Sequence, residues 1–426
     1  MKVRDLLLFL FGHRASIERI ASSRWAWLIG LILVATAGIA RNYDHLYLLE
    51  QREWFFGPLV MSLVSIMVIF TSLGLGLGMS RSGKPLGPQF RSFLTLFWLT
   101  APCAWVYAIP VENYTDILTS TKWNLAFLGI VSVWRVFIMS RAVAVLTGAR
   151  AIRVLVLILL PASFEMILGS VTKRLSLIQI MSGVRLPPHH IWLQQATEFT
   201  LMASMALFFI LCFMVIITGG TKETQEPDGQ PRSSVTIGSL ARPVQKSSLW
   251  LWPVSLAILG LWGLIAMKTQ PIVARNFQLE KLIKAEEWKS AVAYAAQFKE
   301  TDFSTIHYLP PGPYPRQGVF SLPPSGNLLL AMDGTEPSWL KQIWLEQTQT
   351  QIRLNLEAVS REPEKLAELI AKFPVLSTTI EEQEKELRSV PTRGRSREDD
   401  TWLRDFDRLQ EILQGASATQ QNAGTK

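Results

Sequence analysis

Hydrophobic residues gather in the first 267 positions, in runs of about 16 to 25 residues that are separated by polar connections. A helix of about that length crosses the ~30 Å hydrocarbon core of a bilayer. Tryptophans lie at the ends of several runs, as they do in the aromatic belts of membrane proteins. The pattern predicts seven transmembrane helices, over residues 25–40, 55–79, 92–111, 123–147, 151–170, 197–219 and 249–267.

The segments outside these runs differ from them in composition. Residues 1–24 are basic around a short apolar run, which favours an interfacial helix lying on the membrane. Residues 220–248 are polar and contain Pro, Gly and Ser, which predicts a flexible linker. Residues 268–414 are charged, with apolar positions at three- and four-residue spacing, so we expect soluble helices there. Residues 415–426 are expected to be disordered.

The predicted fold class is therefore all-α, with a polytopic membrane helix bundle of about seven transmembrane helices and a small C-terminal α-helical soluble domain. Residues 25–219 would form a six-span bundle, and residues 249–267 the seventh helix. Part of the tail, residues 279–298, is similar to one helix pair of a tetratricopeptide repeat. No second copy follows at a 34-residue period, so a repeat array is not supported.

The net charge of +8 is unevenly divided along the chain. Residues 1–267 hold 22 Lys and Arg against 12 Asp and Glu, or +10, whereas residues 268–426 hold 20 against 22, or −2. The basic excess therefore belongs to the membrane half, where it orients helices and meets the lipid bilayer. The tail shows no basic stripe with interleaved aromatic residues, so nucleic acid is not an expected partner.

The connections between the predicted helices also differ in charge. One set holds 15 Lys and Arg and the alternate set holds six. The side with more positive charge faces the cytoplasm, which places the N-terminus inside and, with seven spans, the C-terminal domain in an extracytoplasmic position. If residues 151–170, which contain Pro161 and Glu165, are re-entrant, the tail is cytoplasmic instead. The expected location is the bacterial inner membrane.

Three charged residues fall inside the fourth and fifth predicted spans, namely Arg135, Arg141 and Glu165. A charge at the bilayer centre costs roughly 3 kcal/mol or more, so such residues are normally paired or face protein. Two interpretations remain open. In the first, the three residues form an intramembrane polar site for an ion, a proton or a polar substrate. In the second, Arg135 and Glu165 form an internal salt bridge that holds the helical hairpin, and Arg141 extends to the cytoplasmic surface.

Signals for enzymatic chemistry are weak. The sequence lacks a G-x-S-x-G motif. Residues 78–84 match a phosphate-binding loop, but Pro85 replaces the Ser or Thr that binds magnesium. Neither the histidines nor the two cysteines have the spacing of a metal site. We therefore expect no enzyme activity, no cofactor and no bound metal. The residues considered were His45, His189, His190, His307, Cys103 and Cys212.

The N-terminal stretch RDLLLFLFGHRASIERIASSRWAWLIGLILVATAGIARNYDHLYL resembles the start of uncharacterised bacterial polytopic membrane proteins, some of them loosely grouped with the Yip1-like fold. The resemblance covers about the first 70 residues and contains no catalytic motif. It implies a compact five-span bundle without enzymatic chemistry. This chain departs from that pattern in its seven predicted spans and its long C-terminal domain.

The expected function is a non-enzymatic scaffold or interaction protein of the cell envelope, with a protein partner bound by the C-terminal helical domain. The tail's tryptophans either present that binding surface or form an ordinary core. The alternative is a transporter or channel subunit that uses the intramembrane Arg/Glu site, and a membrane enzyme is the least favoured class. The tryptophans in question are Trp288, Trp339, Trp344 and Trp402.

Overall fold

The computed structural model covers most of the 426-residue chain, and every regular element that it describes is a helix. Contacts divide the chain into two compact units, Met1–Lys173 with Pro188–Gln270, and Arg174–Pro187 with Pro271–Lys426. The described residues are 2–44, 46–78, 85–111, 114–177, 188–220, 248–303, 324–354 and 363–389, with isolated residues at 240, 243 and between 403 and 411.

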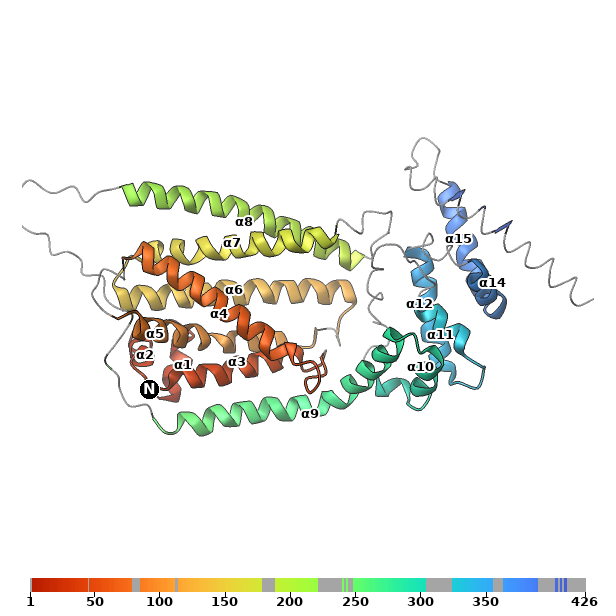
Figure 1. The fold of residues 1–426 in the computed structure, drawn as a ribbon, viewed down its shortest axis with the longest axis horizontal. Helices are drawn as coiled ribbons and strands as arrows, with labels where there is room; N and C mark the ends of the chain where they lie inside the picture. The colour runs from red at the N-terminus through yellow and green to blue at the C-terminus, as the bar shows by residue number, and fades with distance from the viewer. Residues whose placement is uncertain are drawn as a thin grey trace, which may run out of the picture. The chain divides into compact units, whose positions relative to one another are not determined.

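Five helices are long and apolar enough to cross a bilayer. They expose large apolar side chains, among them Met61 and Met67 of one helix and Phe209 and Phe213 of another. Exposing apolar surfaces of this size to water is unfavourable, whereas contact with lipid acyl chains is not, so the protein is embedded in a membrane. The five are α4 (Glu53–Gly76), α6 (Ile117–Thr147), α7 (Ala151–Leu177), α8 (Pro188–Gly220) and α9 (Leu251–Lys284) (Figure 1).

The other two predicted spans differ from the expectation of seven long helices. The first forms α3 (Ala26–Asn42), which has only 17 residues. The third is broken into α5 (Leu86–Trp98) and a 3₁₀ helix, η2 (Ala101–Ala108). Pro102 lies in the first turn of η2 and has no backbone N–H, so it cannot continue the hydrogen-bond ladder of α5.

The broken span packs against α3. The indole nitrogen of Trp105 donates a hydrogen bond of 3.1 Å to the Thr36 hydroxyl, and the Tyr43 hydroxyl donates one of 3.2 Å to the Ala108 carbonyl. Along the same face, a Cβ added to Gly30 would lie 2.9 Å from the Cβ of Trp98. A side chain at position 30 would therefore separate α3 from α5.

Helices α4 and α7 also pack closely. The Ser72 hydroxyl donates to the Leu157 carbonyl at 2.8 Å, and a Cβ on Gly76 would lie 2.3 Å from the Leu157 side chain. Gly74 of α4 and Gly78 just after it make no such contact among the described residues, since added Cβ atoms there meet nothing within 4 Å.

The turn between α6 and α7 lies where the sequence predicts it. At its start α6 is capped by Asp116, whose carboxylate accepts from the backbone N–H groups of Leu118 and Thr119, both at 3.0 Å. At its end Gly148 adopts a left-handed conformation with φ of 72°, as is usual for a helix C-terminus. Two short helices, α1 (Val3–Phe9) and α2 (Arg14–Ala21), lie against this bundle, and α2 contacts α5 and α6.

Helix α9 is continuous across residues 267 and 268, where the sequence analysis separates the seventh span from the tail. Its residue Gln270 is bound to the loop after α3. The Gln270 amide nitrogen donates to the carbonyls of Tyr43 and Leu46, both at 3.0 Å, and its oxygen accepts from the Leu48 N–H at 2.8 Å. The Thr269 hydroxyl adds a hydrogen bond of 2.6 Å to the Tyr43 carbonyl.

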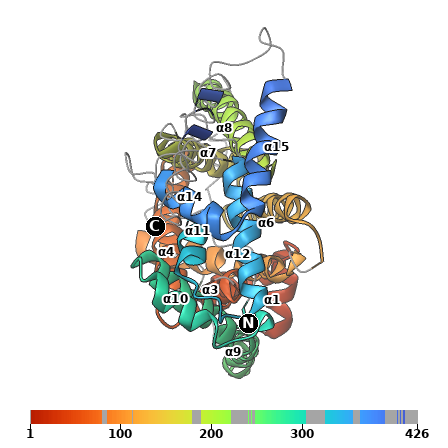
Figure 2. The same cartoon turned by 90° about the vertical axis from the view of Figure 1, so that its right-hand side faces the viewer.

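The second unit is a group of short helices around one apolar core. Helix α12 contacts both α11 and α15 in this unit, as both views show (Figures 1 and 2). The largest fully buried side chain in the unit is that of Trp344, on α12. Besides the end of α9, the elements are α10 (Trp288–Ala295), the 3₁₀ helix η5 (Glu300–Asp302), α11 (Pro324–Ala331), α12 (Ser338–Leu354), α14 (Pro363–Lys372) and α15 (Val375–Ser389).

Several sequence predictions lie outside the described residues. These are most of the linker at 220–248, the tail at 415–426, the near-match to a phosphate-binding loop, and the histidines at 45 and 307. The side chains of His189 and His190 lie outside them as well.

Candidate functional site

Arg135 lies on α6 and faces the break in the third predicted span. Its Nε donates a hydrogen bond of 3.0 Å to the Thr100 hydroxyl, and its guanidinium carbon lies 4.9 Å from the centre of the Phe97 ring. Such cation–π contacts are worth about 2 kcal/mol when desolvated. The arginine is therefore held by a hydroxyl and an aromatic face.

Thr100 occupies the junction between α5 and η2. It is fully buried, and its hydroxyl also donates to the Phe97 carbonyl at 2.6 Å. The last carbonyls of a helix carry a partial negative charge, because they lack partners within that helix. The guanidinium of Arg135 therefore lies beside the electronegative end of α5, which offsets part of the cost of its burial.

Glu165 lies in a different environment, between α7 and α4. Its Oε2 accepts a hydrogen bond of 2.8 Å from the Ser65 hydroxyl, and its Oε1 is buried without a hydrogen-bond partner among the described residues. No ion pair joins Arg135 to Glu165 in the described part of the chain. Arg135 contacts the end of α5 and Glu165 contacts α4, so a direct salt bridge between them does not hold the α6–α7 hairpin.

Arg141, the third member of the predicted polar group, is exposed near the end of α6. Its Cγ would lie 3.2 Å from a Cβ added to Gly12, so its aliphatic stem runs along the α1–α2 loop. This position agrees with an arginine that extends toward the membrane surface. The structure thus gives each of the three residues its own neighbours, and their joint role stays a prediction.

Exchanging Thr100 for valine is expected to destabilise the protein more than exchanging Arg135 for leucine. Thr100→Val leaves a half-buried guanidinium without its hydroxyl partner, which costs about 2 kcal/mol. Arg135→Leu removes the charge together with its desolvation cost, and Thr100 keeps its bond to Phe97. The measurement is thermal melting of the detergent-solubilised chain. The double variant should melt near Arg135→Leu, and a double variant as unstable as Thr100→Val would contradict this account.

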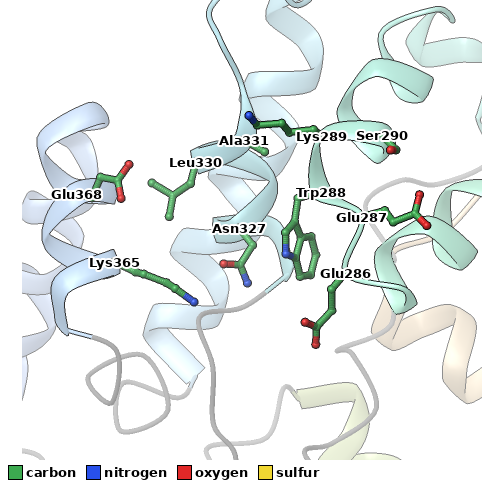
Figure 3. Close-up of a pocket in the computed structure, with 10 residues that line it drawn as sticks. All are labelled: Glu286, Glu287, Trp288, Lys289, Ser290, Asn327, Leu330, Ala331, Lys365 and Glu368. Atoms are coloured by element: carbon green, nitrogen blue, oxygen red, sulfur yellow. The ribbon is translucent and has the colours of Figure 1, made fainter.

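The second candidate site is a groove in the helical tail. Its volume is about 580 Å³, and α10, α11, α14 and the turn before α10 surround it (Figure 3). Trp288, Leu330 and Ala331 are half-buried and pack against the core of the second unit, so they give the groove an apolar base. The remaining lining residues are polar or charged, namely Glu286, Glu287, Lys289, Ser290, Asn327, Lys365 and Glu368.

The turn that carries the two groove glutamates has an unusual backbone. Glu286 has φ of 58°, the left-handed conformation that glycine normally supplies at the end of a helix. For a residue with a Cβ this conformation costs roughly 1–2 kcal/mol. Backbone N–H groups of Glu286 and Glu287 donate to the Ile283 and Leu282 carbonyls at 3.0 Å, so the turn is well defined. Strained positions of this kind occur at ligand-binding sites more often than elsewhere.

No family model, curated protein or solved structure matches this chain. The resemblance of the first 70 residues to Yip1-like proteins therefore stays a prediction.

The sequence analysis missed several residues of these sites. Thr100 and Ser65 are ordinary hydroxyl residues in apolar runs, and only the fold brings them to Arg135 and Glu165. Glu286 has no glycine-like feature in the sequence, and only the fold shows that it ends α9 in a left-handed conformation. A partial signal existed for Thr100, because Pro102 two positions later indicates a kink or an interruption of the helix there.

Proposed function

We propose that this chain is a non-enzymatic scaffold or interaction protein of the bacterial cell envelope, in which membrane helices anchor a protein-binding helical unit. The observation that supports this most directly is the groove on the second unit, where an apolar base around Trp288 is bordered by charged residues. An aromatic residue in a recess with a polar rim is the usual arrangement at the centre of a protein interface.

The charges around the groove favour a particular kind of occupant. Glu286 and Glu287 lie together on the turn before α10, and Lys365 and Glu368 lie on α14 at the opposite side (Figure 3). A protein segment that places an apolar side chain on Trp288 and a neighbouring Lys or Arg beside the two glutamates matches this pattern. We therefore propose a basic-apolar segment of another envelope protein as the partner.

The proposed topology follows the charge bias of the connections. The N-terminus is cytoplasmic, and seven crossings of the bacterial inner membrane place the C-terminal unit on the extracytoplasmic side. The five long helices supply five crossings. Helix α3 supplies another, and α5 with η2 supplies the last, because residues 86–108 together are long enough to cross.

A second candidate function is a transporter or channel subunit. The observation in its favour is Arg135 at the interruption between α5 and η2, because broken helices frame substrate and ion sites in many transporters. The groove is the stronger support, since its volume and lining can accommodate a partner directly.

Site-specific photo-crosslinking in living cells tests the groove. A photoreactive residue in place of Lys289, which lines the groove, should yield a discrete crosslinked partner. The same residue in place of Glu346, which is exposed on α12 and does not line the groove, should not. The double variant Glu286→Lys/Glu287→Lys should lower the Lys289 adduct about tenfold or more by like-charge repulsion.

Folding of the double variant is checked by protease resistance of the full chain, because both glutamates are exposed. A crosslinked band of equal strength from position 346, or an adduct that the charge reversal leaves unchanged, would reject the groove as the binding site.

A further inference from the structure

The α1–α2 hairpin and the adjoining turn between α6 and α7 form a basic end of the membrane unit. The loop between α1 and α2 is fixed on α6, because the Trp134 indole donates to the Leu10 carbonyl at 2.8 Å and its ring lies tilted against that of Phe11, with 6.2 Å between the ring centres. Gly12, with φ of 73°, lets this loop approach the stem of Arg141. The N-terminal segment is thus part of the folded unit.

The two acidic residues described on α1 and α2 are both paired with arginines. Asp5 is buried and accepts hydrogen bonds of 3.0 and 2.6 Å from Arg19, and Glu18 pairs with Arg14 at 3.2 Å. Burial acts to raise the pKa of Asp5, but the hydrogen bonds from Arg19 and from the Lys2 N–H outweigh it and lower that pKa, so the carboxylate stays charged. In each pair the two charges neutralise each other, and the pair of Asp5 with Arg19 also fastens α1 to α2.

Among the described residues, no ion pair joins the other arginines at this end to a carboxylate. Residues 77–111 and 117–164 contain no Asp or Glu at all. Arg141 and Arg150, at the two sides of the α6–α7 turn, are exposed, as is Arg4 on α1. Arg153 donates to the Gly76 carbonyl at 2.8 Å, a neutral partner that leaves its charge uncompensated. The end therefore carries a concentrated positive charge that an external anion can neutralise.

Apolar side chains stand next to these arginines. Leu7 and Phe11 expose 61% and 75% of their surface, and Leu7 lies one helical turn after Arg4. Exposed apolar residues beside arginines, next to helices that enter the bilayer, suit the boundary between acyl chains and headgroups. A soluble phosphate would explain the arginines alone, whereas a lipid explains both sets of residues.

We propose that this basic end is a binding site for the phosphate headgroup of an anionic phospholipid, with Arg4, Arg141 and Arg150 contacting the phosphate and Leu7 and Phe11 lying among the acyl chains. The site is independent of the groove on the second unit. Basic clusters next to transmembrane helices bind anionic headgroups by this chemistry.

Native mass spectrometry of the full chain in mild detergent tests the proposal, with phosphatidylglycerol and phosphatidylcholine of matched acyl chains as probes. Phosphatidylglycerol should stay bound in preference to phosphatidylcholine. Each arginine near the surface contributes about fivefold, so Arg4→Gln/Arg141→Gln should weaken phosphatidylglycerol binding about 25-fold. Arg4→Lys/Arg141→Lys should retain most of it.

Arg41→Gln/Arg52→Gln serves as the matched control, because these two exposed arginines flank the loop between α3 and α4. This variant should bind phosphatidylglycerol as the parent does. Equal binding of the two lipids, or equal loss in both glutamine variants, would overturn the proposal. So would displacement of the lipid by soluble glycerol phosphate, because the site would then recognise a free anion.

Discussion

Replacing Trp344 with alanine is expected to unfold the second unit while leaving the membrane helices in place. The side chain is fully buried on α12, at the centre of a core that includes Leu328, Leu340 and Leu366. Truncating a buried tryptophan costs about 3–5 kcal/mol, a large fraction of the stability of a small helical unit. Limited proteolysis of the full chain in membranes should then cleave rapidly within residues 288–389.

Trp344→Phe provides the matched control. The indole nitrogen of Trp344 is buried without a hydrogen-bond partner among the described residues. Phenylalanine keeps most of the apolar volume and removes the unpaired donor, so this variant should resist protease nearly as well as the parent. If Trp344→Ala were as protease-resistant as Trp344→Phe, the core around α12 would be wrongly placed.

Replacing Gly30 with leucine is expected to disrupt the packing of the membrane unit. An added Cβ already lies 2.9 Å from the Cβ of Trp98 and 3.7 Å from the backbone nitrogen of Leu99. Neither atom is the mobile end of a flexible side chain, so α3 and α5 must separate, at a cost of roughly 3 kcal/mol. Fluorescence-detected size-exclusion chromatography after heating should show a marked loss of the monodisperse peak.

Gly129→Leu tests whether this loss is specific to the contact. Gly129 is exposed on α6, and an added Cβ there meets nothing within 4 Å. Its replacement should leave the melting behaviour unchanged or slightly improved, because leucine favours helix more than glycine does. If both variants lost the monodisperse peak to a similar extent, any added side chain in these helices would be harmful. The loss in Gly30→Leu would then not be specific to the contact of α3 with α5.

The membrane helices could be predicted because hydropathy over about 20 residues is a property of the chain itself. That signal located α4, α6, α7, α8 and the membrane part of α9. It did not reveal the break after Trp98, since Pro102 within an apolar run is compatible with either a kinked helix or an interrupted one. The choice depends on the packing of η2 against α3, which no local pattern encodes.

The partners of the charged residues were harder to predict. Arg135 and Glu165 follow each other along a predicted hairpin, which made a salt bridge between them the simplest hypothesis. In the fold Arg135 meets Thr100, 35 positions earlier, and Glu165 meets Ser65, 100 positions earlier. Both contacts depend on how the helices are rotated about their axes, and this is decided by close approaches such as that of Gly76 to Leu157.

Hydrogen bonds fix the end of the membrane part of α9 to the loop after α3. Sliding or rotation of α9 would break the three hydrogen bonds of the Gln270 side chain and the one from Thr269 to the Tyr43 carbonyl. The next residue, Pro271, lacks the N–H that would bond to the Met267 carbonyl, which makes bending there less costly than elsewhere in the helix. Bending at Pro271 therefore disturbs fewer hydrogen bonds than sliding of α9 along its axis.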